Sequence, residues 1–196
     1  MLLATNELLE LPVMSLQTGN EIGITVVTIL DRGTLQILAY ELAGKQLDML
    51  PAYLKIEDIR ELSDIGFIVD SSEEIITLDD IVVAKDAYTH PLRLEHMRVV
   101  DELGTKLGKV ERAIMNTDSF RVEQLHVQRP FFKSLSDTNL IIHRQQIVDI
   151  DDKTITVKSG TVKTKERPKP LEKQPFVNPF RGPSHPQPES AKSTRR

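Results

Sequence analysis

The sequence predicts a mainly β fold, with two tandem small β-barrels, a short helical linker between them and a disordered C-terminal tail. Three observations lead to this prediction. A weak internal repeat occurs at a spacing of about 85 residues. In both copies the alternation of apolar and polar residues slips midway, which indicates a bulged or bent strand. Finally, seven of the eleven prolines fall within 168–188.

The first copy is expected over residues 1–71. A glycine-bearing turn, Gly19–Gly23, precedes a run rich in β-branched residues, and a polar turn at Asp31–Thr34 separates it from a second run. This order is typical of a hairpin. The second run changes phase, because its apolar residues are Leu35 and Ile37, then Tyr40 and Leu42. Bent strands of this kind are needed to close a small sheet into a barrel, which a short strand at Phe67–Val69 would complete.

The second copy is expected over residues 92–160 and repeats these features. Its turn is Gly104–Gly108, its polar turn is Asn116–Ser119, and its last strand is near Ile155–Val157. The second run again changes phase, with apolar residues at Phe120 and Val122, then at Leu125 and Val127. The glycines Gly19, Gly23, Gly104 and Gly108 are therefore interpreted as structural turn residues.

The linker, residues 72–91, mixes acidic and apolar residues. A helix cap and an acidic first turn would come from Ser71 or Ser72, followed by Glu73 and Glu74. A strand at Ile75–Leu78 competes with the helix, and the helix is preferred near Asp79–Ala84.

The tail, residues 161–196, contains nine Lys/Arg and three Glu, so that it carries +6 while residues 1–160 carry −10. Its prolines and few apolar residues cannot bury enough surface to offset the ordering entropy. We therefore expect a disordered tail, partly of polyproline II character. An acidic body with a basic tail is not typical of a protein that coats nucleic acid with its folded face.

Several enzyme and cofactor classes are disfavoured by the sequence. The absence of cysteine excludes disulfides, thiolate metal sites and cysteine nucleophiles. The five histidines lack zinc-helix spacing, no nucleophile elbow is present, and the Gly104–Gly108 turn lacks the ending of a phosphate loop. We expect no catalytic residue, metal or cofactor. No apolar run is long enough to span a bilayer and the N-terminus lacks a basic region, so a cytoplasmic location is expected.

Two segments resemble the start of a PRC-barrel domain. They are Leu11–Gly23 and, more strongly, Met97–Val110. The second keeps the glycine pair and a Lys-Val pair, at Gly104, Gly108, Lys109 and Val110. The first keeps Gly19 and Gly23 but has Ile24 and Thr25 in place of the lysine and valine. Together the two resemblances cover roughly residues 1–160.

The resemblance implies a barrel of about six strands in each copy and a role as an adaptor. Proteins of this family include the cytoplasmic subunit of photosynthetic reaction centres, a ribosome-maturation factor that binds a small-subunit protein, and division- or sporulation-associated proteins. No catalytic residues are characteristic of the family. The function expected is therefore a non-enzymatic scaffold that mediates protein–protein interactions. The alternative is a ribosome-maturation or RNA-associated assembly factor, in which the partner is a ribosomal protein or RNA.

Two aromatic segments are candidate partner-binding sites. In the second copy, two adjacent aromatics stand between basic residues, at Arg129, Phe131, Phe132 and Lys133. Neighbouring strand residues point to opposite faces, so one phenylalanine could be an exposed anchor, although both could also cap the barrel end. In the tail, Phe176 and Phe180 could fold onto a groove, and the basic residues around them could contact phosphate-rich surfaces.

Overall fold

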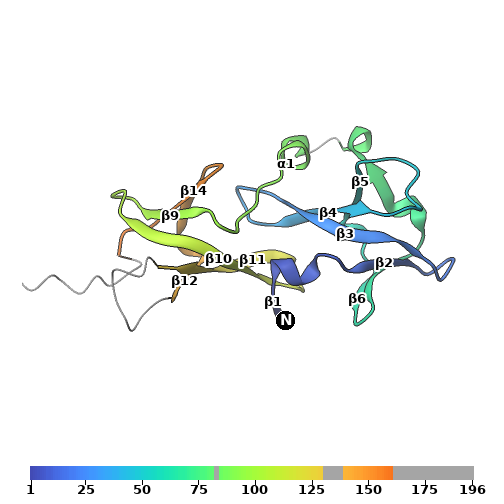
Figure 1. The fold of residues 1–196 in the computed structure, drawn as a ribbon, viewed down its shortest axis with the longest axis horizontal. Helices are drawn as coiled ribbons and strands as arrows, with labels where there is room; N and C mark the ends of the chain where they lie inside the picture. Colours follow the sequence, from blue (N-terminus) through green and yellow to red (C-terminus); the bar gives the residue numbers. More distant parts are fainter. Residues whose placement is uncertain (82–83, 130–138, 161–196) are drawn as a thin grey trace, which may run out of the picture. The chain divides into compact units, whose positions relative to one another are not determined.

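Two β-sheets of seven strands each make up the part of the chain that the computed structural model describes, residues 1–81, 84–129 and 139–160 (Figure 1). The first sheet has the order β6-β7-β2-β3-β4-β5-β8. Its strands are β2 (Pro12–Ser15), β3 (Glu21–Leu30), β4 (Ile37–Ala43), β5 (Ala52–Lys55), β6 (Glu61–Ser63), β7 (Gly66–Val69) and β8 (Ile75–Thr77).

The second sheet has the order β12-β11-β10-β9-β14-β13, with β1 added beside β10. Its strands are β1 (Leu2–Ala4), β9 (Arg98–Asp101), β10 (Lys106–Asn116), β11 (Arg121–Gln128), β12 (Asn139–His143), β13 (Ile147–Ile150) and β14 (Thr154–Val157). The remaining elements are 3-10 turns and one short helix, namely η1 (Thr5–Leu8), η2 (Ile56–Asp58), η3 (Ser72–Glu74), η4 (Leu78–Asp80), η5 (Arg144–Gln146) and α1 (Lys85–Thr89). None of the helices described is long and apolar enough to cross a membrane.

The two sheets repeat one topology. The path β5-β4-β3-β2-β7-β6 in the first sheet corresponds to β12-β11-β10-β9-β14-β13 in the second, and β2–β7 and β9–β14 are the parallel pairs. The register repeats as well, because Glu41 lies opposite Tyr53 just as His126 lies opposite Ile141. Even the unusual backbone angles recur, with φ of 58° at Leu35 and 47° at Phe120.

The bulges that the sequence predicts are confirmed. In β4 the register shifts where Leu38 is the extra residue, and in β11 it shifts at Glu123, 85 positions later. A second shift affects β3 and β10 at matching positions. The pairings among the described residues form open sheets that end at β6 and β8, or at β12 and β13, so a closed barrel is not among them.

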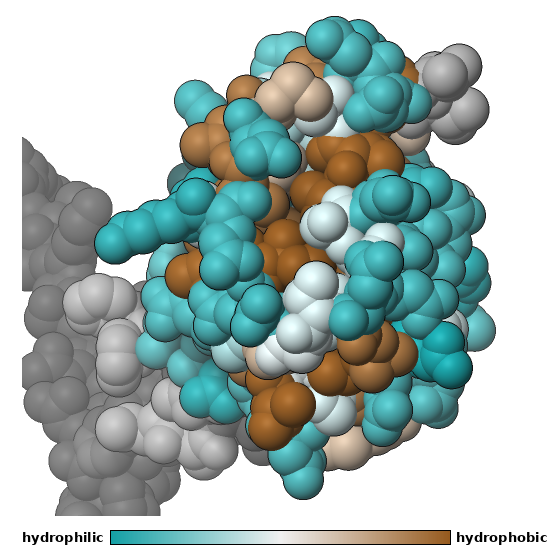
Figure 2. Space-filling model, turned by 90° about the vertical axis from the view of Figure 1, so that its right-hand side faces the viewer, coloured by the Kyte–Doolittle hydropathy of each residue, from teal (hydrophilic) through white to brown (hydrophobic). Residues whose placement is uncertain are grey.

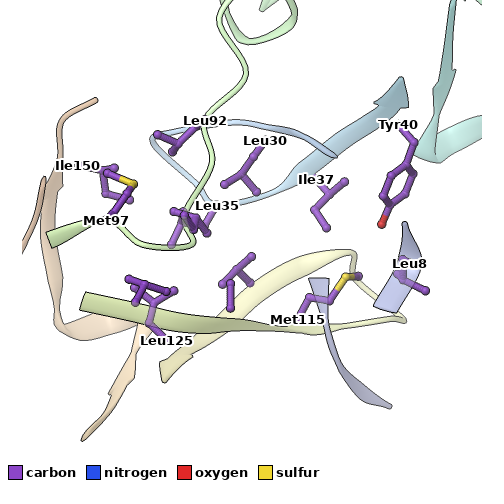
Figure 3. Packing of buried hydrophobic residues seen from close by; sticks show 14 of the residues in the cluster. Leu8, Leu30, Leu35, Ile37, Tyr40, Leu92, Met97, Met115, Leu125 and Ile150 are labelled. Atoms are coloured by element: carbon purple, nitrogen blue, oxygen red, sulfur yellow. The ribbon is translucent and has the colours of Figure 1, made fainter. Parts of the chain in front are cut away.

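Both sheets lie within one compact unit, Met1–Lys163, and share a hydrophobic core (Figure 3). Figure 3 shows side chains from the first half, such as Leu30, Leu35 and Ile37, facing Met115 and Leu125 of the second half. The domain boundaries expected from the sequence stay a prediction, but the two copies do not have separate cores.

The copies meet through a pair of reciprocal backbone hydrogen bonds. The Ile37 N–H donates to the Phe120 carbonyl at 2.8 Å, and the Val122 N–H donates to the Leu35 carbonyl at 3.0 Å. Ile37 and Val122 occupy equivalent positions in the repeat, as do Leu35 and Phe120. The contact is therefore locally two-fold. Because these two bonds use the bulged ends of β4 and β11, the phase slip in the sequence also marks the junction between the copies.

The N-terminal strand does not join the first sheet. β1 pairs antiparallel with β10, with Leu3 opposite Met115, and the Thr117 N–H donates to the Met1 carbonyl at 2.9 Å. β9 pairs with only the first part of β10, Lys106–Lys109. The N-terminal residues pair with the backbone of β10 beyond the part that β9 covers. A segment that was expected to belong to the first copy therefore contributes a strand to the second.

The linker is less helical than expected. The Ser71 hydroxyl accepts a hydrogen bond from the Glu73 N–H at 3.1 Å, but the turn that it caps ends after three residues. The competing strand forms instead, as Ile75–Thr77 pairs with the edge of β5. The helix α1 begins only at Lys85, beyond the Asp79–Ala84 stretch preferred from the sequence. The β-branched residues of β8 gain backbone partners on that edge, which a short isolated helix would not provide.

Replacing Tyr88 with alanine should lower the free energy of unfolding by about 2–3 kcal/mol, because a buried aromatic residue is lost. Tyr88 of α1 is 7% exposed and packs edge-on against Tyr53, with ring centroids 5.1 Å apart. Urea denaturation would measure the loss, and Tyr88→Phe should cost much less. Unchanged stability of Tyr88→Ala would show that the packing of α1 against the first sheet does not stabilise the fold.

Candidate functional site

The outer face of the second sheet is the surface that faces away from the shared core on β10, β11 and β12. Residues directly opposite each other in antiparallel strands point to the same face. One row is Arg112, His126 and Ile141, and the next is Ile114, Gln124 and His143. Between them, the row Ala113, Leu125 and Ile142 is buried in the core. The two outer rows contain no carboxylate, but the bulge residues Glu111 and Glu123 lie beside them on the same face.

The equivalent face of the first sheet is covered by the chain itself. Its corresponding rows are Val27, Glu41 and Tyr53, and Ile29, Ala39 and Lys55. Three of these residues, Ile29, Ala39 and Tyr53, are buried in a separate hydrophobic cluster. The linker completes this cluster with Ile81 and Tyr88. Ile76, Leu78 and Ala87 of the same segment pack against it. Figure 1 labels α1 in this segment, which continues the chain after β8, the last strand of the first sheet.

The outer face of the second sheet has no such cover among the residues described. Ile141, which corresponds to the buried Tyr53, is 51% exposed. His143 on the same strand is also exposed. Nearby, the Arg144 guanidinium lies 3.5 Å from the Glu123 carboxylate. Arg112 of the outer rows belongs to none of the ion pairs among the described residues.

The edges of the two sheets differ in the same way. β8 pairs with β5, placing Ile76 opposite Tyr53. The equivalent strand β12 is at the end of its sheet, and no other strand of the described ranges pairs with it beyond β11. When the sequence of the second copy is aligned so that β14 matches β7, the positions that correspond to Ile75–Thr77 are Lys163, Thr164 and Lys165. None of these is a large apolar residue. An edge strand with free backbone groups is a template for another strand.

Of the four glycines interpreted as turn residues, two lie in turns and two lie within strands. Gly19 and Gly104 have φ of 69° and 77°, in the left-handed region, and lie in the turns before β3 and β10. Gly23 and Gly108 lie within these strands where another backbone passes closely. A Cβ at Gly23 would be 2.8 Å from the Ala43 carbonyl oxygen. The turn leads into a strand, as predicted, and offers no helix N-terminus to a phosphate.

The aromatic candidates mostly lie outside the described residues. Arg129 is half-buried at the end of β11. Phe131, Phe132, Lys133, Phe176 and Phe180 lie outside the described ranges.

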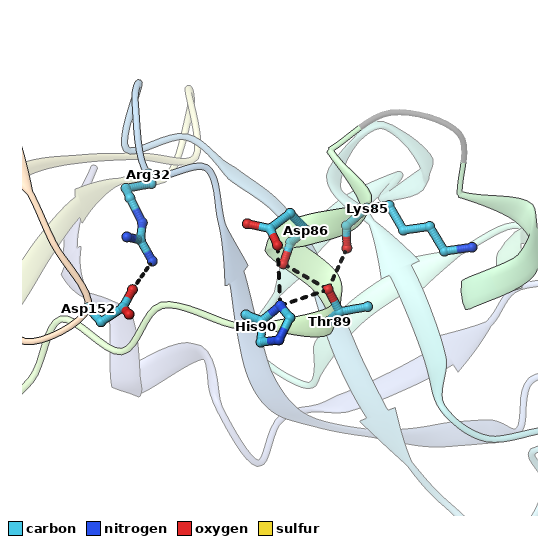
Figure 4. Close-up of polar contacts among 6 residues, drawn as sticks. All are labelled: Arg32, Lys85, Asp86, Thr89, His90 and Asp152. Atoms are coloured by element: carbon cyan, nitrogen blue, oxygen red, sulfur yellow. Dashed lines mark hydrogen bonds and ion pairs between the residues drawn. The ribbon is translucent and has the colours of Figure 1, made fainter.

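A polar group around α1 resembles a catalytic arrangement only in composition (Figure 4). The Thr89 hydroxyl lies 3.1 Å from His90 Nδ1, and the Asp86 carboxylate lies 3.2 Å from the same nitrogen. A proton relay needs one ring nitrogen for the nucleophile and the other for the carboxylate. Both partners here share Nδ1, and the side chains of His90 and Asp86 are 77% and 93% exposed. This group is therefore a solvated helix end rather than an active site.

The neighbouring ion pair in Figure 4 has a structural role. The Arg32 guanidinium donates to the Asp152 carboxylate at 2.7 Å and links the two halves of the chain. Among the described residues, no three His, Asp or Glu side chains come together as a group that could hold a metal ion.

Exposed apolar side chains occur elsewhere but are scattered. Figure 2 shows several hydrophobic areas on one side of the molecule, separated by hydrophilic ones. Large apolar residues that are at least half exposed are Met1, Leu2, Leu16, Met49, Leu50, Ile65, Leu103, Ile141 and Val148. Single exposed apolar residues need no functional explanation. Ile141 differs because its counterpart in the other copy is buried by a segment of the chain.

Sequence reasoning missed this outer face. A signal exists, but it requires the copies to be aligned at an offset of 85. The apolar residues Val27 and Ala39 then lie against Arg112 and Gln124. The change from apolar to polar at matching strand positions indicates a face that is packed in one copy and open in the other.

Comparison with known proteins assigns a family to part of the chain. Residues 93–163 match the family model described as PRC-barrel domain, which is somewhat over a third of the sequence and corresponds to the second sheet from just before β9 onward. No curated protein matches the chain.

Proposed function

We propose that this chain is a tandem of two PRC-barrel copies that acts in the cytoplasm as a non-enzymatic adaptor between proteins. The family match of residues 93–163 supports the second copy, and the identical strand order and bulges of the first sheet support the first. The observation that carries the proposal is the difference between the two outer faces. One is packed beneath the chain's own linker, whereas the other presents Ile141 and an edge, β12, to which no further strand of the described residues is added.

The mode of binding that fits best is strand addition to β12. An extended segment of the partner protein would pair with β12 as β8 pairs with β5, and its alternate side chains would lie over Ile141. Backbone hydrogen bonds supply affinity in this mode, while the side-chain rows supply selectivity. The first copy thus provides, within the same chain, an example of the contact proposed for the second.

The charge distribution favours a protein partner over the RNA-associated alternative. Residues 1–160 carry −10, so their field opposes the approach of a long polyanion. The exposed large apolar side chains of the described residues include no aromatic residue on which bases could stack. The basic tail remains the feature that favours RNA.

An Ile141→Asp variant should lose partner binding by tenfold or more while the fold remains intact. A carboxylate on the edge strand β12 would be desolvated by an incoming strand, and an anchor residue would be lost. The matched control is Val148→Asp on β13, because Val148 is 50% exposed, is also β-branched and lies at the other edge of the same sheet.

The measurement is affinity capture with the full chain, after nuclease treatment, followed by titration of the captured protein. The expected result is a partner that survives nuclease, binds the Val148→Asp variant normally and is lost with Ile141→Asp. Equal binding to both variants would refute the role of the outer face. Loss of every partner on nuclease treatment would favour the RNA-associated alternative.

A further inference from the structure

Four basic residues gather where the outer face continues onto β9 and β14. In the antiparallel register Lys109 of β10 lies directly opposite Arg98 of β9. The Arg98 N–H donates to the carbonyl of Lys153, just before β14, at 3.1 Å. Arg93, in the segment before β9, completes the group. These four residues, called the cationic cluster below, line a shallow hollow of about 370 Å³ together with Glu95, His96, Met97 and Asp152.

The cationic cluster is unfavourable for the isolated fold. Like charges directly opposite each other in a sheet are destabilising. The hollow keeps an excess of positive charge, because only two carboxylates accompany the four cations. Asp152 also accepts from Arg32 at 2.7 Å, and Glu95 accepts from the neutral Thr5 hydroxyl at 3.0 Å. Among the described residues, none of the four cluster cations belongs to an ion pair.

The first sheet shows that the fold does not require these charges. The residue equivalent to Arg98 is Pro12, and the residue equivalent to Lys109 is Ile24, since these two are paired in the same register. Ile65, just before β7, takes the place of Lys153. The same backbone thus forms with no cation at any of the three positions. Charges that weaken a fold and are not needed to build it indicate a ligand of opposite charge.

We infer that the cationic cluster binds an acidic segment, rich in Asp and Glu, of the partner protein. This inference rests on the proposed adaptor function and names the chemistry of its partner. Lys109 also pairs with Gln128 of β11, so that the cluster continues the two outer rows, which contain no carboxylate. An acidic segment would relieve the repulsion between Arg98 and Lys109, and it would bind on β9 and β10, separated from a strand added to β12 by the width of β11 and β12. A long nucleic acid fits less well, because it would extend beyond the cluster onto a body that carries −10, whereas a short acidic segment need cover only the cluster.

The test uses the full chain and two labelled probes of equal charge, a peptide of eight glutamates and a single-stranded RNA. The double variant Arg98→Gln/Lys109→Gln removes two cluster charges. The matched control Lys163→Gln/Lys165→Gln removes the same charge from the tail, whose own cations give a background affinity for both probes. Binding is measured by fluorescence anisotropy at low and at physiological salt, because a charge-driven contact weakens with salt.

The expected result is at least tenfold weaker binding of the peptide by the cluster variant and less than threefold weakening by the tail variant. The melting temperature of the cluster variant should equal or exceed that of the parent, since a like-charge pair is removed. Equal weakening by both variants would overturn the inference. RNA binding that is tighter than peptide binding and lost with the cluster variant would replace it with a nucleic-acid interface. Retained capture of the protein partner by the cluster variant would leave the adaptor function standing and refute only the acidic segment.

Discussion

Replacing Gly108 with alanine is expected to lower the free energy of unfolding by about 3 kcal/mol or more, a large loss for a single methyl group. A Cβ at this position would lie 2.2 Å from the Gln128 carbonyl oxygen and 2.8 Å from Val127 Cγ1. Both neighbours belong to β11, which is held by β10 on one side and β12 on the other. The backbone therefore has no way to move aside without breaking pairs.

The control is the other glycine of the same turn. Gly104 has φ of 77°, but no heavy atom lies within 4 Å of its Cβ position. Gly104→Ala should therefore cost only the left-handed conformation, about 1–2 kcal/mol. Urea denaturation of the two variants checks the order. Equal and small losses in the free energy of unfolding for the two variants would contradict the close approach of β10 and β11 at Gly108.

Replacing Phe67 with alanine should lower the free energy of unfolding by about 3–5 kcal/mol. Phe67 of β7 is fully buried, and its ring lies 5.1 Å from the ring of Tyr40, tilted by 37°. The side chain belongs to the core that both sheets share, so the cavity would weaken both halves together. A single cooperative transition at lower denaturant is the expected result. Two separate transitions, with the second unchanged, would contradict the shared core.

Tyr40 provides the complementary variant. Its hydroxyl is buried and finds no hydrogen-bond partner among the described residues, so Tyr40→Phe should be neutral or stabilising by up to about 1 kcal/mol. Burial raises the pKa of the Tyr40 hydroxyl well above its ordinary value. The folded state therefore favours the neutral hydroxyl. This contribution to the free energy of unfolding is fully present below about pH 10 and is lost as the pH rises further. Stability measured from pH 8 to 11 should fall less steeply for Tyr40→Phe than for the parent chain.

The repeated sheets could be predicted because their signals are local. The changes of phase between Ile37 and Tyr40 and between Val122 and Leu125 reflect a bulge in each strand, which depends on few neighbouring residues. The turn glycines could be predicted for the same reason, since a left-handed backbone is a property of a single position. Both signals remain readable although the two copies share few identical residues.

The parts that could not be predicted depend on tertiary edges. β1 and β8 are three residues long and become strands only because β10 and β5 have unpaired edges. No alternation within Leu2–Ala4 shows which sheet it joins. The reciprocal hydrogen bonds near Gln36 and Arg121, and the core that the copies share, likewise depend on contacts about 85 residues apart.

The candidate site shows the same division. The Arg129–Lys133 and Phe176–Phe180 predictions came from aromatic residues in isolated segments, and apart from Arg129 they fall outside the described ranges. The outer face and the cationic cluster are properties of cross-strand rows. Their residues, such as Arg112 and His126, are far apart in sequence and become neighbours only through the register of β10 and β11.

The most direct test of the adaptor proposal is site-specific photo-crosslinking from the outer face. A photoreactive amino acid is placed at position 141 of the full chain and, as a control of equal exposure, at position 148. After nuclease treatment, position 141 should crosslink to one extended segment of a single protein, and position 148 should not. Equal crosslinking from both positions, or crosslinks to RNA alone, would contradict the account.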